Sequence, residues 1–166
     1  MRRGIHTIRG GFTESKNPSI PRKYTLDNGD WQSNMHIDSF EVIYTNVRDT
    51  QEAVTGHAIF VVLAASEEGA TPLAYGTEDF SSLGLRLNDN RIIGYACMDA
   101  TMNPIVLLDP DHIIPGDLYI NAWEISSAGT LSGLSTDIGF MVKMKRVQQS
   151  GNDALMSQIK ETSYED

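Results

Sequence analysis

The residues best suited to chemistry in this sequence form an acidic loop, Asp109-Pro110-Asp111-His112, which Asp117 follows closely. Three carboxylates within nine residues supply the oxygen ligands that Ca²⁺ prefers, so Asp109, Asp111 and Asp117 are a candidate weak calcium site. Asp and Pro are also ordinary turn residues, and the glycine and terminal glutamate of the spaced calcium loop are missing. A solvated turn is therefore the favoured interpretation, and no cofactor is expected beyond this candidate structural Ca²⁺.

A second group of charged side chains lies near the N-terminus. Residues 1–24 carry six basic groups against Glu14 alone, a net charge of +5, whereas the remaining residues carry seven basic and 21 acidic groups, a net charge of −14. The six basic residues are Arg2, Arg3, Arg9, Lys16, Arg22 and Lys23. Because Gly, Ser and Pro are interspersed among them, we expect a flexible arm that orders only on binding a partner. Nucleic acid or an acidic neighbouring subunit would suit it, and a solvated tail is the alternative.

The sequence lacks the signatures of catalysis. It has no Gly-x-Ser-x-Gly elbow, no phosphate-binding loop that ends in Gly-Lys-Ser/Thr, no His-Glu-x-x-His and no Gly-x-Gly-x-x-Gly. The four histidines are isolated from one another, and the single cysteine, Cys97, has no basic neighbour in sequence that would activate it. We therefore expect a protein that is not an enzyme. There is also no run of about 18 apolar residues, so no membrane partner is expected.

Apolar residues with a period near two predict β-strands along most of the chain. The clearest predicted strands are Met35–Val47, Val54–Ala65, Arg91–Met98, Ile105–Leu108, Leu118–Ile125 and Ile138–Val147. The segment Val54–Ala65 is apolar on both faces, which predicts a central strand buried on both sides. Asn152-Asp153 is expected to cap a short helix that carries Leu155, Met156 and Ile159.

These elements predict an all-β fold, a β-sandwich of about eight strands of the jelly-roll or immunoglobulin-like kind, with a short C-terminal helix. Of the two, a single jelly-roll-like β-sandwich is the fold we favour. We expect a flexible basic arm over residues 1–30, the sandwich over residues 31–149, and the helix and tail over residues 150–166. Deletion of residues 2–23 should on this view leave the sandwich folded.

The basic arm, the predicted sandwich, the run Leu108–Ile120 and the closing strand Phe140–Val147 together resemble the coat proteins of small icosahedral viruses built on a single jelly roll. The resemblance covers residues 1–148 and is one of architecture. It implies that the arm lines the interior of a shell while the sandwich tiles its wall.

The function expected from these features is that of a viral structural protein, a capsid subunit that self-assembles into a shell in the host cell interior and resides in the virion. Its partners would be copies of itself, the viral nucleic acid through the arm, and other virion proteins. The alternative is a carbohydrate- or receptor-binding β-sandwich, such as a phage decoration or fibre domain, with exposed aromatic side chains. Trp31 and Trp123 could serve there, although core packing is the favoured interpretation of both. A metal-dependent enzyme built on Asp109–Asp117 is the least favoured.

Overall fold

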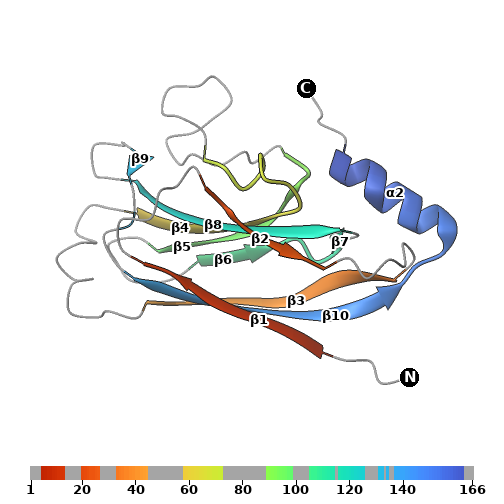
Figure 1. Ribbon diagram of the computed structural model, residues 1–166, viewed down its shortest axis with the longest axis horizontal. Helices are drawn as coiled ribbons and strands as arrows, with labels where there is room; N and C mark the ends of the chain where they lie inside the picture. Colours follow the sequence, from red (N-terminus) through yellow and green to blue (C-terminus); the bar gives the residue numbers. More distant parts are fainter. Residues whose placement is uncertain are drawn as a thin grey trace.

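The structure, a computed structural model, describes residues 5–13, 20–26, 33–44, 58–72, 89–98, 105–114, 116–125, 131–132, 134 and 137–162. Within them the chain forms two antiparallel sheets that pack face to face, with one helix beyond their end (Figure 1). The first sheet has the order β1 (Ile5–Phe12), β10 (Ile138–Gln148), β3 (Ser33–Tyr44) and β7 (Ile113–Ile114). The second has the order β2 (Arg22–Thr25), β8 (Asp117–Ile125), β4 (Ala58–Ala64), β5 (Ile92–Met98) and β6 (Ile105–Leu108), and β9 (Leu131–Ser132) pairs with β8.

The strand pairs are nested within one another. Strand β1 pairs with β10, β2 with β8, β3 with β7 and β4 with β5, and every pair is antiparallel. The chain therefore has the topology of one long hairpin that is wound around itself. Strands from its N-terminal half pair with strands from its C-terminal half, and successive pairs lie alternately in the first and the second sheet. This winding is that of a jelly roll. The predicted all-β sandwich is confirmed, with β6 and β9 added to the eight nested strands.

Strand β4 shows why the second sheet holds together on both faces. Ile59, Val61 and Leu63 point into the main core between the two sheets, where they are fully buried. The alternate residues Phe60 and Val62 pack on the opposite face, against Trp123. The rings of Phe60 and Trp123 stack with their centroids 6.2 Å apart. The prediction of a strand buried on both sides is confirmed, and Trp123 is a core residue; Trp31 lies outside the described residues.

The prediction that residues 1–30 form an arm separate from the sandwich is wrong for two segments. Ile5–Phe12 is strand β1, paired along its whole length with β10, and Arg22–Thr25 is strand β2, paired with β8. Ile8 and Phe12 point inward, and Phe12 is buried in the main core. The residue midway between them is a glycine, Gly10, and any larger residue would clash, because a Cβ there would lie 2.7 Å from Phe140 Cζ. The burial of Phe12 and the backbone ladder offset the ordering entropy that was expected to keep this segment free.

The C-terminal helix, α2 (Gly151–Thr162), is confirmed, but its cap is not the expected one. Ser150 precedes the helix, and its Oγ accepts a hydrogen bond from the Asp153 backbone N–H at 3.3 Å and donates one to Asp153 Oδ2 at 2.6 Å. Ser150 is therefore the N-cap residue, and Asp153 lies in the first turn. Ala154 is fully buried and anchors the helix, whereas Leu155, Met156 and Ile159 are exposed.

Candidate functional site: a basic sheet edge

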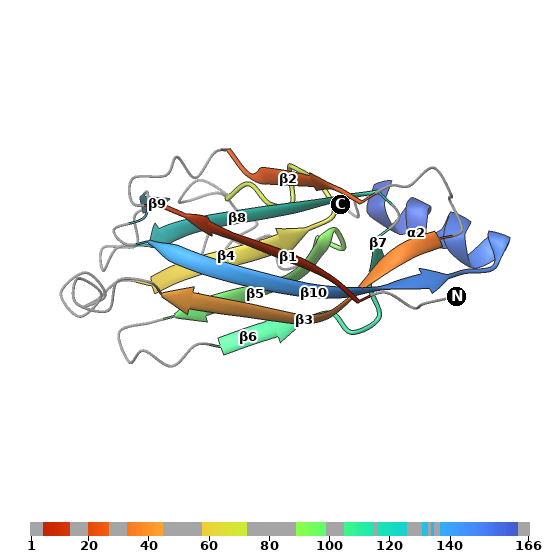
Figure 2. The ribbon, with the colours of Figure 1, turned by 60° about the horizontal axis from the view of Figure 1, so that its bottom comes forward.

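Strands β1 and β2 bring three of the six predicted basic residues to one edge of the sandwich. Arg9 lies on β1, the edge strand of the first sheet, and Arg22 and Lys23 lie on β2, the edge strand of the second (Figure 2). The two strands are neighbours across the sandwich, since a Cβ at Gly10 would lie 3.1 Å from Arg22 Nη1. We call Arg9, Arg22 and Lys23 the basic edge. Arg2, Arg3 and Lys16 lie outside the described residues.

Arg22 on β2 reaches across this edge to Phe12 on β1 and so connects the two sheets. Its guanidinium carbon lies 5.0 Å from the centroid of the Phe12 ring, a cation–π contact. Beside it, Tyr24 meets Phe140 edge-on, with ring centroids 6.4 Å apart. Arg22 thus covers the aromatic rim of the core while its side chain stays exposed to solvent.

Lys23 already has an anionic partner. Its Nζ lies 2.7 Å from Asp117 Oδ2 and 5.8 Å from the centroid of the Tyr119 ring. The hydrogen bond to Asp117 is the main reason why the pKa of Lys23 is raised above its ordinary value. Because Lys23 is exposed, this pair stabilises the fold little. Its consequence is electrostatic: much of the Lys23 charge is balanced within the chain.

Arg9 is the basic-edge residue whose charge is least balanced. It points outward from the first sheet, in the row that Met141 and Glu41 continue on β10 and β3. The lysines of the same face have partners: Lys143 Nζ lies 2.9 Å from Glu41 Oε1, and Lys145 Nζ lies 2.8 Å from Asp38 Oδ1. Arg9 makes no ion pair with any described residue.

The ion pair between Lys145 and Asp38 changes the titration of Asp38. The hydrogen bond from Lys145 is the main cause that lowers the pKa of Asp38 below its ordinary value, and His36 adds to it.

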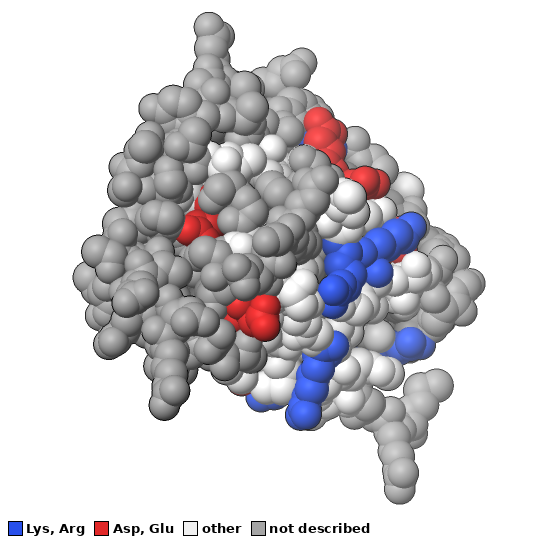
Figure 3. Space-filling view, turned by 60° about the vertical axis from the view of Figure 1, so that its left-hand side comes forward, with Lys and Arg blue, Asp and Glu red and all other residues white. Residues whose placement is uncertain are grey.

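Figure 3 shows several Lys and Arg side chains close together on one side of the described surface. The described part of the chain therefore presents a basic surface on an otherwise acidic protein.

The structure does not bring the three candidate calcium ligands together. Asp109 Oδ1 accepts a hydrogen bond from the Asp111 N–H at 3.0 Å, and Asp109 Oδ2 lies 3.6 Å from His112 Nδ1. Asp117 is paired with Lys23 instead. Among the described residues, which include all three aspartates, no three His, Cys, Asp or Glu side chains form a group that could hold a metal ion. The favoured interpretation of Asp109–Asp111 as a turn agrees with this geometry.

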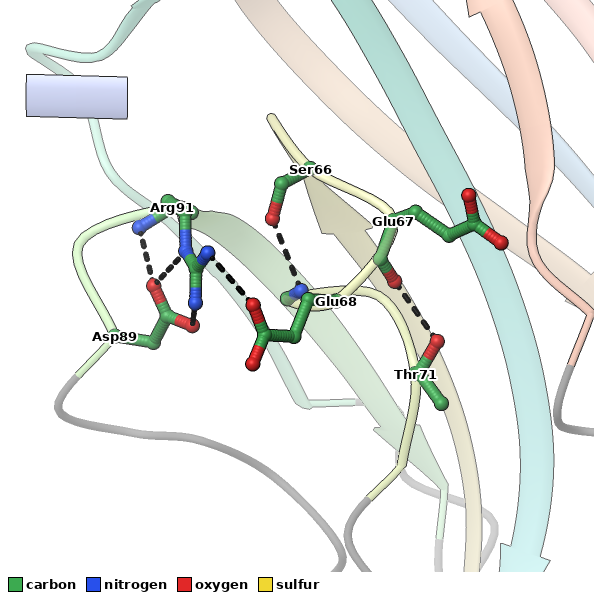
Figure 4. Close-up of polar contacts among 7 residues, drawn as sticks. Ser66, Glu67, Glu68, Thr71, Asp89 and Arg91 are labelled. Atoms are coloured by element: carbon green, nitrogen blue, oxygen red, sulfur yellow. Dashed lines mark hydrogen bonds and ion pairs between the residues drawn. The ribbon is translucent and has the colours of Figure 1, made fainter. Parts of the chain in front are cut away.

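An ion cluster that sequence reasoning missed lies at the start of β5 (Figure 4). Arg91 Nε and Nη2 donate to Asp89 Oδ1 and Oδ2 at 2.8 and 2.7 Å, and Arg91 Nη1 donates to Glu68 Oε2 at 3.0 Å. The Asp89 hydrogen bonds are the main reason why the pKa of Arg91 is raised. Arg91 and Asp89 are both buried. The cluster ties the turn that carries Glu68 to the second sheet.

Two further contacts hold the same turn. Gly69 N–H donates to Ser66 Oγ at 3.0 Å, and Thr71 Oγ1 donates to the Glu67 carbonyl at 2.8 Å (Figure 4). The buried Asn121 Nδ2 on β8 donates to the Ala70 carbonyl at 2.7 Å. These bonds satisfy buried polar groups and have a structural role.

No protein-family model and no curated protein matches this sequence. Among solved structures, the chain is similar to one from the cryo-EM structure of Mud crab tombus-like virus. That match covers 96% of this chain and 88% of the other, with 10% sequence identity and a TM-score of 0.26. A TM-score this low does not establish a common fold, so the jelly-roll assignment depends on the strand pairing alone. No helix among the described residues is both long enough and apolar enough to cross a membrane.

Proposed function

We propose that this chain is a structural subunit that self-assembles into the shell of a virus particle. The observation that carries the proposal is the nested strand pairing of a single jelly roll, an architecture used by capsid proteins and also by lectin domains and cupins. Because a fold hosts several functions, the surfaces must decide among them. The proposal includes no catalytic step and no cofactor.

The described surfaces favour assembly over small-ligand binding. Ile105, Val106 and Leu107 on β6 are exposed, and so are Leu155, Met156 and Ile159 on α2. Exposed apolar groups of this kind mark contacts between protein subunits. A sugar-binding site would instead need exposed aromatic rings, and Trp123 is fully buried. The carbohydrate-binding alternative therefore gains no support from the described residues.

The basic edge supplies a second kind of contact in this proposal. Arg9, Arg22 and Lys23, with Arg2, Arg3 and Lys16, would bind the phosphates of the genome or the acidic surface of a neighbouring subunit. Because Lys23 is paired with Asp117 and Arg22 covers Phe12, Arg9 is the residue of the basic edge most available to a partner.

The test is the mass of the purified chain by light scattering, with absorbance at 260 and 280 nm on the same peak. A megadalton particle is expected. Excess absorbance at 260 nm should fall in an Arg9→Ala variant and remain in Lys143→Ala, the matched control, since Lys143 is paired with Glu41. A chain that stays monomeric under all assembly conditions would overturn the proposal. The test uses the substitution Arg9→Ala and not a deletion of residues 2–23, because that deletion would remove strand β1.

A further inference from the structure

The described strands leave four sheet edges, and three of these edges have features that protect against pairing with another chain. The edge strand β1 carries the outward Arg9, and β2 carries Arg22 and Lys23. Strand β7 is only two residues long and covers only Met35 and His36 of β3, and the rest of that β3 edge carries the charged Asp38 and Glu41. Short edges and edges with charged side chains are the usual devices that prevent edge-to-edge association. The fourth edge, β6, has neither device.

Strand β6 is apolar and open. Its four residues, Ile-Val-Leu-Leu, carry no charge, and Ile105, Val106 and Leu107 are 57%, 41% and 51% exposed. On one side it pairs with β5, and no described strand lies on its other side. The outward residues Ile105 and Leu107 stand opposite Cys97 and Tyr95 of β5, which pack against the Phe60–Trp123 cluster. The exposed strip thus continues a buried apolar surface of the same sheet.

The direction of the backbone groups on β6 follows from its ladder with β5. The Asp109 N–H donates to the Ile93 carbonyl at 2.7 Å, toward β5. Backbone groups of an antiparallel strand point alternately to either side, so those of Leu107 also face β5, and those of Val106 and Leu108 face the open edge. Two N–H and two C=O groups are therefore directed at an incoming strand.

We propose that two copies of this chain pair through β6, antiparallel, about a two-fold axis that passes between the two Leu107 residues. This register places Val106 of each copy opposite Leu108 of the other, so that all the edge-directed backbone groups bond across the axis. It also keeps the outward side chains of both copies on one face, as a continuous sheet requires. A two-fold contact of this kind is the commonest in homo-oligomers.

The charge distribution favours a second copy at this edge. Each chain carries a net charge of −9, so copies repel unless they meet where charges are absent, and β6 has none. In the proposed register Asp109 stands opposite Ile105, which separates the two Asp109 residues by about 14 Å along the strands. That separation exceeds the screening length of about 8 Å at physiological salt. The pairing of two copies does not require a shell, so it can be tested independently of the proposed function.

Disulfide trapping tests the register directly. Residues opposite one another in a non-hydrogen-bonded pair have Cα atoms about 4.5 Å apart, within the range that a disulfide spans. Leu107→Cys in a Cys97→Ser background should therefore give a disulfide-linked dimer on a non-reducing gel. Ile43→Cys in the same background is the matched control, because Ile43 is 57% exposed on β3 of the other sheet, and it should stay monomeric on the gel. Equal linking by both variants, or linking by neither, would overturn the proposal.

Two further variants test the pairing in solution by sedimentation at high micromolar concentration. Leu107→Lys places like charges at the axis and should convert the dimer to monomer, whereas Ile43→Lys should not. Val106→Pro removes an N–H that faces the open edge and leaves the bonds to β5 intact, so it should also yield monomer. A wild-type chain that is monomeric here would refute the pairing. Linked dimers without megadalton particles would refute only the shell, and particles whose Leu107→Cys subunits remain unlinked would refute only the pairing.

Discussion

Arg91 is a buried charged residue whose loss should destabilise the fold strongly. Its guanidinium makes two hydrogen bonds to the Asp89 carboxylate, and both residues are buried. Replacement by Leu removes the cationic partner of a buried carboxylate, which keeps its hydrogen bond from the backbone N–H of residue 91, and breaking a buried ion pair typically costs about 3–5 kcal/mol. We expect Arg91→Leu to lower the free energy of unfolding by that amount in denaturant titrations.

Glu68→Gln is the matched control for this prediction. Glu68 bonds to the same guanidinium, but its side chain is 59% exposed, so water replaces the lost contact. Removing a surface pair typically costs less than about 1 kcal/mol. Similar losses in Glu68→Gln and Arg91→Leu would show that burial does not govern the cluster.

Asp38 should make the stability of the first sheet depend on pH. The hydrogen bond from Lys145 lowers its pKa in the folded state, so the ionised form is favoured by folding. Its contribution is complete above the unfolded pKa of about 3.9 and is lost as the pH falls through the lower folded pKa. The stability difference between wild type and Asp38→Asn, below about 1 kcal/mol at neutral pH, should therefore vanish in strong acid. A difference unchanged by acid would exclude the ion pair as its cause.

Residue types alone identified the basic residues but not their partners. Lys23 meets Asp117, and Arg91 meets Glu68, because strand register and a turn bring distant residues together. Sequence spacing does not specify which strands pair or in what register, so neither ion pair was predictable. Asp109, Asp111 and Asp117 illustrate the opposite case: closeness in sequence suggested a common site, and the start of β8 directs Asp117 toward β2.

At the scale of elements, the strands with visible alternation were predicted to within a residue or two. Strands β8 and β10 are examples, and the uniformly apolar β6 was found from the turn residues that bound it. Strand β1 was missed because Gly10 and Gly11 occupy positions where side chains would have revealed the period. The close approach of Phe140 requires Gly10, so the same packing that joins β1 to the core hides it from the sequence.

Truncation tests whether β1 belongs to the fold. Deleting residues 2–13 removes Phe12 from the core and exposes the edge of β10, and the loss of a buried Phe side chain alone typically costs about 3–5 kcal/mol. We expect the free energy of unfolding to fall by at least that amount. Deleting residues 2–4, which precede β1, should leave it unchanged. Equal stability of the two truncated chains would contradict the placement of β1.

At the scale of the whole molecule, salt should separate the two kinds of contact. Copies with a net charge of −9 repel, and salt screens that repulsion, so association through apolar surfaces should strengthen as salt rises. Nucleic-acid binding should weaken instead. With Lys23 held by Asp117, five basic residues remain, and log K for single strands should fall against log salt with a slope of about −3.5.

Light scattering on nucleic-acid-free protein and anisotropy of a labelled oligonucleotide measure these two dependences separately. If self-association also weakened with salt, the contacts between copies would be ionic. The basic edge would then meet the acidic surface of a neighbour, and Arg9→Ala would weaken association among protein copies alone. An oligonucleotide slope near zero would point the same way, because phosphate contacts necessarily release counterions. The signs of the two slopes therefore assign the basic edge either to the genome or to the neighbouring subunit.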